Sequence, residues 1–164
     1  MPKGIRIDGV NDSKKLTEKK RNELFEIIKE KAVAYSIEIV DHKVIDKINI
    51  LEATFLAMKN AVLNLKVKPE IILVDGNHKI PDLDIRQEAI VAGDAKSFCI
   101  ACASILAKVT RDRLMYQYAK EYPQYLFEDH KGYGTKKHIE LIKQIGPCEI
   151  HRKTFAPVKD FIKL

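Results

Sequence analysis

The 164-residue sequence contains few cysteines, glycines and prolines, and it has no long hydrophobic run. Its three cysteines, Cys99, Cys102 and Cys148, are an odd number in a chain long enough to build a core without disulfides, so we expect a reduced, cytoplasmic protein. Seven glycines and six prolines exclude collagen-like and linker compositions. No stretch approaches the ~20 apolar residues that span a bilayer, and no apolar segment follows the basic N-terminus. The sequence therefore predicts neither a membrane span nor a secretory signal.

Apolar and charged residues are both plentiful, at 46% and 32% of the chain. This composition and length are typical of one globular domain, which we expect to cover residues 1–164. The net charge is +6, and residues 101–164 hold 12 basic and 7 acidic side chains, a net charge of +5. A basic surplus in the C-terminal third favours a polyanionic partner, although a solvated basic face would explain it equally well.

Apolar residues at three- and four-residue spacing predict four helical stretches. Thr17 is a suitable cap for the first, Asn49 interrupts and recaps the second, and Gly146 ends the last. The predicted helices cover residues 16–34, 44–65, 101–122 and 136–145.

Three stretches have the pattern of strands. Residues 34–41 alternate apolar and polar side chains, residues 71–74 form an apolar run typical of a strand buried on both faces, and residues 88–94 form a second short run. Strands that alternate with helices indicate an α/β or α+β domain. Three strands are few for this length, and the buried strand needs neighbours on both sides, so either a strand is hidden or the sheet is incomplete.

Two aspartates follow predicted strands, and each lies beside a glycine. Asp75 precedes Gly76, and Asp94 follows Gly93. Ligand sites in open α/β sheets favour the carboxyl ends of strands, and carboxylate oxygens are ligands that Mg²⁺ and Mn²⁺ prefer. The alternative is that each Asp-Gly pair only makes a turn.

Cysteine and histidine spacing gives little support for a metal site. Cys99 and Cys102 form a CxxC motif, but the surrounding sequence is apolar and no second pair completes four ligands, so we interpret both as buried core thiols. The five histidines show no metal-ligand spacing, and we interpret each as a surface or capping residue. They are His42, His78, His130, His138 and His151.

Lysines near predicted helices and one loop aromatic are candidates for nucleic-acid contact. Lys14 precedes the first helix and Lys108 lies on the third, where cations can bind phosphate; a solvated charge cluster is the alternative. Tyr133 lies between two glycines, where it could stack on a sugar or base or pack over the core.

Six segments, taken together and in order, resemble the type 2 ribonuclease H enzymes, called ribonuclease HII in bacteria. They extend over nearly the whole chain, and as a set they are far more specific than any one of them. The segments are GVNDSKKLTEKKR (9–21), NILEATFLAM (49–58), ILVDGN (72–77), AGDAKSFCIACASILAKVTRD (92–112), HKGYGT (130–135) and HRKTFAPVK (151–159).

The resemblance implies an α/β, ribonuclease H-like mixed sheet flanked by helices. It implies an endonuclease that cuts the RNA strand of RNA–DNA hybrids, or duplex DNA at single ribonucleotides, with Mn²⁺ or Mg²⁺ and with no obligate protein partner. Asp75 and Asp94 match family metal ligands, and Tyr133 matches the aromatic that packs on the sugar at the RNA–DNA junction. Lys14 matches a residue near substrate phosphates. Ser104 and Lys108 match positions beside the active site.

The chain also departs from the family pattern at its start. Family members begin with a strand that carries an adjacent Asp-Glu pair, then a Gly-Arg-Gly loop that senses the 2′-hydroxyl, then a second strand. This sequence starts after both strands, so two of four family carboxylates are missing, and neither Asp8 nor Asp12 is expected to replace them. We therefore expect little cleavage by this chain alone. An inactive module that binds hybrids is one alternative, and a different carboxylate nuclease is another.

Overall fold

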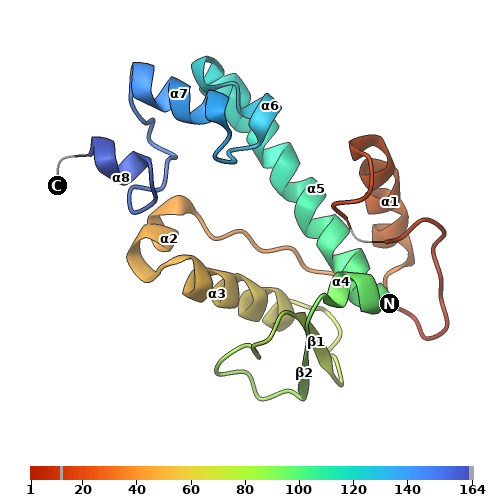
Figure 1. Cartoon of the computed structure of the whole chain (residues 1–164). Helices are drawn as coiled ribbons and strands as arrows, with labels where there is room; N and C mark the ends of the chain where they lie inside the picture. The colour runs from red at the N-terminus through yellow and green to blue at the C-terminus, as the bar shows by residue number, and fades with distance from the viewer. Residues whose placement is uncertain (12, 163–164) are drawn as a thin grey trace. The chain divides into compact units, whose positions relative to one another are not determined.

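The computed structural model describes residues 1–11 and 13–162 as helices and a small parallel sheet (Figure 1). The chain divides into two compact units. The first comprises Met1–Ile39 and Phe55–Val109, and the second comprises Val40–Thr54 and Thr110–Leu164. The predicted α/β class is confirmed. Asp12 lies outside the described residues.

The core of the first unit forms where helix α1 (Glu18–Lys31) packs on the beginning of helix α5 (Phe98–Glu121). Helix α1 begins as predicted at Thr17, whose hydroxyl accepts a hydrogen bond from the backbone N–H of Lys20 at 3.2 Å. The apolar residues of both helices recur at three- and four-residue spacing, which places them on one face. The buried residues of this core are Ile7, Leu24, Phe25, Ile28, Cys102, Ile105, Leu106 and Val109.

The sheet of the first unit consists of strands β1 (Ile72–Asp75) and β2 (Gln87–Ile90), which pair in parallel. The register sets Asp75 opposite Ile90. Of the run predicted to be buried on both faces, only Val74 is buried, while Ile72 and Leu73 are partly exposed. That prediction was wrong because, within the described residues, β1 has a single neighbouring strand.

The strand predicted for residues 34–41 does not form. Its alternating pattern is present, but a strand also requires a neighbouring backbone, and the described residues supply none. The segment is held instead by side chains, since the Asn64 amide donates a hydrogen bond to the Glu38 carboxylate at 2.8 Å.

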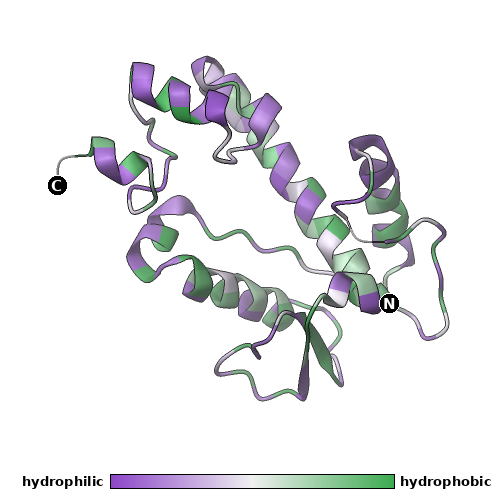
Figure 2. Cartoon of the chain, viewed as in Figure 1, coloured by the Kyte–Doolittle hydropathy of each residue, from purple (hydrophilic) through white to green (hydrophobic). Residues whose placement is uncertain are grey.

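Helices α2 (His42–Ile48) and α3 (Ile50–Leu63) meet at Asn49, as predicted. Asn49 has a φ of 68°, and its side-chain oxygen accepts hydrogen bonds from the backbone N–H groups of Leu51 and Glu52. These contacts satisfy donors that a helix leaves unpaired at its N-terminus. Figure 2 shows that α3 is mainly hydrophobic along its length.

Beyond the end of α5, the described residues of the second unit form three short helices and one longer helix. They are η1 (Pro123–Tyr125), α6 (Phe127–His130), α7 (Lys136–Ile145) and α8 (Val158–Phe161). Helix α7 matches the predicted range, from its cap at Thr135 to Gly146, whose φ is 78°. The buried residues of its core are Met115, Tyr125, Phe127, Ile142 and Val158.

In the part of the chain that the structure describes, no helix combines the length and the apolar character needed to cross a bilayer.

Candidate functional site

The two aspartates singled out in the sequence lie on neighbouring backbone segments of the first unit. Asp75 is the last residue of β1 and is exposed, and Asp94 is half-buried in the short helix α4 (Gly93–Lys96). The Oδ1 atom of Asp75 accepts a hydrogen bond from the backbone N–H of Gly93 at 2.8 Å. Because Gly93 directly precedes Asp94, this bond ties the side chain of one aspartate to the backbone beside the other.

The prediction that Asp94 follows a strand end needs a correction. Strand β2 ends at Ile90, and the chain then turns through Ala92, whose φ of 55° is left-handed. Asp94 therefore lies in the first turn of α4 rather than at a strand tip. The turn carries the backbone across to Asp75, which a continuing strand would not do.

Glycine is required at position 93 because of this close approach. A Cβ atom there would lie 2.6 Å from Cδ1 of Ile100 and 3.3 Å from Oδ1 of Asp75. Real Cβ atoms essentially never show the first distance. The absence of a side chain thus allows α4 to pack against both β1 and the first turn of α5.

Ser104 and Lys108 lie on α5 at four-residue steps from Ile100, so the three side chains share roughly one face of the helix. Both are half-buried. Since Ile100 packs at Gly93, the face that carries Ser104 and Lys108 begins beside the Asp75–Gly93 contact.

Lys14 is exposed in the loop before α1, and Arg21 shapes that loop. The guanidinium Nη1 of Arg21 donates hydrogen bonds to the carbonyl of buried Ser13 at 3.1 Å and to the carbonyl of Leu16 at 2.5 Å. Arg21 was not among the residues predicted from the sequence. Its place one turn into the helix, after a run of lysines, gave no signal that it folds back on the loop.

Tyr133 belongs to the second unit, in the loop between α6 and α7, and 53% of its surface is exposed. The Arg111 guanidinium lies 4.6 Å from the centre of its ring. Its backbone N–H donates to the carbonyl of His130, and its carbonyl accepts from the N–H of Thr135, both at 2.8 Å. The ring is thus about half exposed and lies against the Arg111 guanidinium, outside the buried core of the second unit.

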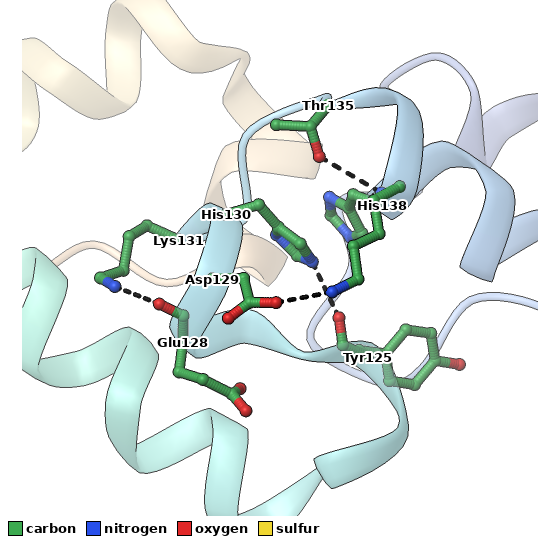
Figure 3. Close-up of polar contacts among 8 residues, drawn as sticks. Tyr125, Glu128, Asp129, His130, Lys131, Thr135 and His138 are labelled. Atoms are coloured by element: carbon green, nitrogen blue, oxygen red, sulfur yellow. Dashed lines mark hydrogen bonds and ion pairs between the residues drawn. The ribbon is translucent and has the colours of Figure 1, made fainter.

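Three histidines that were interpreted as surface or capping residues are buried instead. The rings of His130 and His138 stack with their centres 4.0 Å apart. Figure 3 shows the two side chains next to each other. The Nε2 atom of His138 lies 3.1 Å from that of His151. The spacing of these histidines in the sequence does not indicate that they are buried together, because the segments that carry His130, His138 and His151 meet only in the folded unit.

Burial lowers the pKa of two of these histidines. The pKa of His138 falls because burial disfavours the charged imidazolium. The pKa of His151 falls to about 4, through burial first and through the neighbouring His138 second. Both rings are therefore neutral at pH 7.

The core interpretation of the CxxC motif holds for one cysteine and fails for the other. Cys102 is buried in the core of the first unit, and burial raises the pKa of its thiol to about 11, which disfavours the thiolate that zinc or redox chemistry needs. Cys99, in the first turn of α5, is exposed.

Asp75 and Asp94 are the residues of the first unit that suit a divalent metal ion. Their oxygens are of the type that Mg²⁺ and Mn²⁺ take, and the exposure of Asp75 leaves space for water ligands. Among residues 1–11 and 13–162, no cluster of three or more His, Cys, Asp or Glu side chains is arranged to hold a metal. The described residues therefore offer two carboxylates, which are ligands of the type that such an ion prefers.

The fold resembles that of a solved nuclease. The crystal structure of the ribonuclease H2 from Pyrococcus horikoshii OT3 matches 93% of this chain and 80% of its own chain, with a TM-score of 0.76 and 27% sequence identity. The α/β fold is thus that of a ribonuclease H-type endonuclease, an enzyme class that acts on nucleic acid.

Sequence comparisons define the family more narrowly. The family model for ribonuclease HII matches residues 3–158. The ribonucleases HII of Endomicrobium trichonymphae and Caldicellulosiruptor bescii are each 62% identical to this chain, over 99% and 91% of its length and over 77% and 72% of their own. The chain belongs to the ribonuclease HII family.

Proposed function

We propose that this chain binds a divalent metal ion and a nucleic-acid substrate as a ribonuclease HII does, acting on RNA–DNA hybrids or on duplex DNA with single ribonucleotides. The observation that carries the proposal is the 2.8 Å hydrogen bond from Gly93 to Asp75, which joins the segments of the two aspartates that match family metal ligands.

In this proposal Asp75 and Asp94 hold Mn²⁺ or Mg²⁺. When bound, such ions activate a water molecule and stabilise the charge on the oxygens of a phosphodiester during its hydrolysis. The protein's own contribution is orientation. The Gly93 N–H fixes one oxygen of Asp75, while Ser104, Lys108 and, before α1, Lys14 are proposed to contact substrate phosphates.

Tyr133 and its surroundings are proposed as a second contact with the nucleic acid. The exposed ring is available to pack on a sugar. Beneath it, the Arg111 guanidinium lies 4.6 Å from the ring centre and adds a positive charge that favours a phosphate beside the ring. Arg152 adds a second positive charge in the same unit, since burial and the nearby Arg111 lower its pKa without removing its charge at pH 7.

The metal site is tested with Asp75→Asn and Asp94→Asn, with the exposed loop variant Asp84→Asn as a matched control. Mn²⁺ affinity is measured by calorimetry. Loss of a residue that only supports a metal ligand typically costs about 10–100-fold in affinity, so removal of a ligand is expected to cost at least tenfold. Asp84→Asn is expected to bind Mn²⁺ like the parent chain. Equal affinity in all four proteins would refute the site.

Cleavage is tested on a duplex with one ribonucleotide, with an all-DNA duplex as the control substrate. We propose that residues 1–164 alone cut weakly, because two carboxylates anchor the ions poorly and the family resemblance implies two more in a preceding segment. Placing the corresponding segment of the Endomicrobium trichonymphae relative before residue 1 is expected to restore cutting, and Asp75→Asn is expected to abolish it again. Strong cutting by residues 1–164 that survives Asp75→Asn would contradict the assignment.

Binding without hydrolysis is the second candidate. It is favoured by the exposed Tyr133 on Arg111, in a chain with a net charge of +6, together with the absence of a three-residue metal cluster in the described residues. It predicts affinity for hybrid duplex that falls steeply with added salt. Restored cleavage in the extended protein would exclude it.

A further inference from the structure

His138 and His151 form a buried pair in the second unit that the chemistry proposed above does not use. Their residues are 6% and 7% exposed. His138 lies in the first turn of α7, where the Thr135 hydroxyl accepts a hydrogen bond from its backbone N–H (Figure 3). His151 lies in a turn after Cys148, near the C-terminal end of the chain.

The partners of the two rings define which nitrogen of each carries the proton. The backbone N–H of Cys148 donates to Nδ1 of His151 at 3.0 Å, so that nitrogen accepts and the proton is on Nε2. The Nδ1 atom of His138 lies 2.9 Å from the carbonyl oxygen of Tyr133. A carbonyl can only accept, so Nδ1 of His138 carries the proton and its Nε2 is free to accept from His151 at 3.1 Å.

These hydrogen bonds form a series that runs in one direction and ends at the backbone of Tyr133. It runs from the Cys148 N–H through His151 and His138 to the Tyr133 carbonyl, and each donor meets an acceptor. We propose that His138 and His151 are positioning residues for Tyr133, which hold its backbone so that its ring stays exposed over Arg111. This proposal rests on the proposed role of Tyr133 in substrate contact.

The geometry favours positioning over metal binding. The two Nε2 atoms face each other at hydrogen-bonding distance, and both Nδ1 atoms are occupied by backbone groups, which leaves no nitrogen for a metal. The ionisable groups around the pair are His130 on α6, His42 at the start of α2, Tyr125 of η1 and the thiol of Cys148. None of them carries a negative charge at pH 7 that would favour an imidazolium, because burial raises the pKa of the Cys148 thiol and of the Tyr125 hydroxyl. Both histidine rings are therefore neutral.

The first test uses the full chain without nucleic acid. Nitrogen-15 NMR of labelled histidines reports the proton position on each ring. We expect His138 protonated on Nδ1 and His151 on Nε2, with no titration of His151 between pH 8 and pH 6 and a pKa of His138 below the ordinary histidine value. Protons on the opposite nitrogens, or titration of both rings near pH 6.5, would contradict the proposed series of hydrogen bonds.

The second test compares variants. His138→Phe keeps a ring of similar volume and removes both hydrogen bonds of the His138 side chain. His138→Asn keeps a donor close to the position of Nδ1. His42→Asn is the control, because His42 is a histidine that takes no part in this series of hydrogen bonds. The readout is the ratio of the Kd for an all-DNA duplex to the Kd for a duplex with one ribonucleotide. We expect His138→Phe to lower this ratio about fivefold toward that of Tyr133→Ala, His138→Asn to keep at least half of it, and His42→Asn to match the parent.

Three further outcomes decide the remaining alternatives. His138→Phe combined with Tyr133→Ala is expected to be no worse than Tyr133→Ala alone, because both act through one side chain. Equal weakening toward both duplexes would show a merely structural role and overturn the proposal. If Tyr133→Ala leaves the ratio of the two Kd values unchanged, the proposed function of Tyr133 is wrong. NMR relaxation of the backbone amides of residues 131–135 then tests the positioning role by itself. Only that role predicts faster motion of these amides in His138→Phe.

Discussion

Single residues with little chemistry of their own position the proposed metal ligands. Asp75 would be an ordinary exposed carboxylate at the end of a strand without the N–H of Gly93, which fixes one of its oxygens at 2.8 Å. Gly93 in turn can approach only because it lacks a side chain. The proposed metal site therefore depends on the lack of a Cβ atom at Gly93 as well as on the two aspartates.

Gly93→Ala tests this dependence. The new Cβ would overlap Cδ1 of Ile100 and press on Oδ1 of Asp75, so Ile100 and α4 must shift. We expect a loss of about 1–3 kcal/mol in the free energy of unfolding, as in other overpacked sites, together with a loss of Mn²⁺ affinity. Urea denaturation and calorimetry measure the two effects.

Gly134→Ala is the matched control, because a Cβ at that loop position meets no atom within 4 Å. It is expected to change neither stability by more than about 0.5 kcal/mol nor Mn²⁺ affinity. Unchanged Mn²⁺ affinity in Gly93→Ala would show that the Asp75–Gly93 contact is not needed to bind the ion.

At the scale of helices and strands, the features that could be predicted from the sequence are those that local residue patterns determine. The cap at Thr17, the break at Asn49 and the helix end at Gly146 are confirmed, because each depends on residues close by in the sequence. What failed depends on distant partners. Residues 34–41 have no neighbouring backbone to pair with among the residues that the structure describes, and the three buried histidines come from segments that no spacing rule connects.

The same contrast applies to the candidate site. The choice of Asp75 and Asp94 followed from glycine-flanked aspartates after apolar runs and from the family motifs, which are local. The contact through Gly93 and the support of Tyr133 by Arg111 could not be predicted, because each joins segments about 20 residues apart whose meeting depends on the fold.

The junction between α2 and α3 gives a prediction at this scale. Asn49 supplies two capping hydrogen bonds and has φ 68° and ψ 169°, a region that is essentially restricted to glycine. Asn49→Ala loses the cap and keeps the strain, so we expect it to cost about 2 kcal/mol in the free energy of unfolding. Asn49→Gly removes the strain and is expected to cost only a few tenths of a kcal/mol. Thermal denaturation of both variants checks this order, and a reversed order would contradict the role of Asn49.

At the scale of the whole molecule, the buried histidines couple stability to pH. Because the pKa of His151 is about 4 in the folded protein and near 6.5 when unfolded, the unfolded chain binds more protons between those values. The free energy of unfolding is therefore expected to fall by about 2 kcal/mol between pH 7 and pH 5, and to be unaffected by His151 above pH 7. His138 acts in the same direction.

Urea denaturation at half-unit pH steps measures this effect. In His151→Phe the decline between pH 7 and pH 5 is expected to become shallower, although the variant starts from lower stability because it loses two hydrogen bonds. An identical slope in both proteins would show that His151 is not the group responsible.

Divalent metal binding between Asp75 and Asp94 is the claim on which the proposed function depends. The most direct measurement is a Mn²⁺ titration of the nitrogen-15-labelled chain, because the paramagnetic ion broadens only nearby amide signals. We expect the amides of Gly76, Gly93 and Asp94 to broaden first in the parent chain and to stay sharp in Asp75→Asn. Broadening that begins elsewhere, or that persists at these amides in Asp75→Asn, would contradict the assignment.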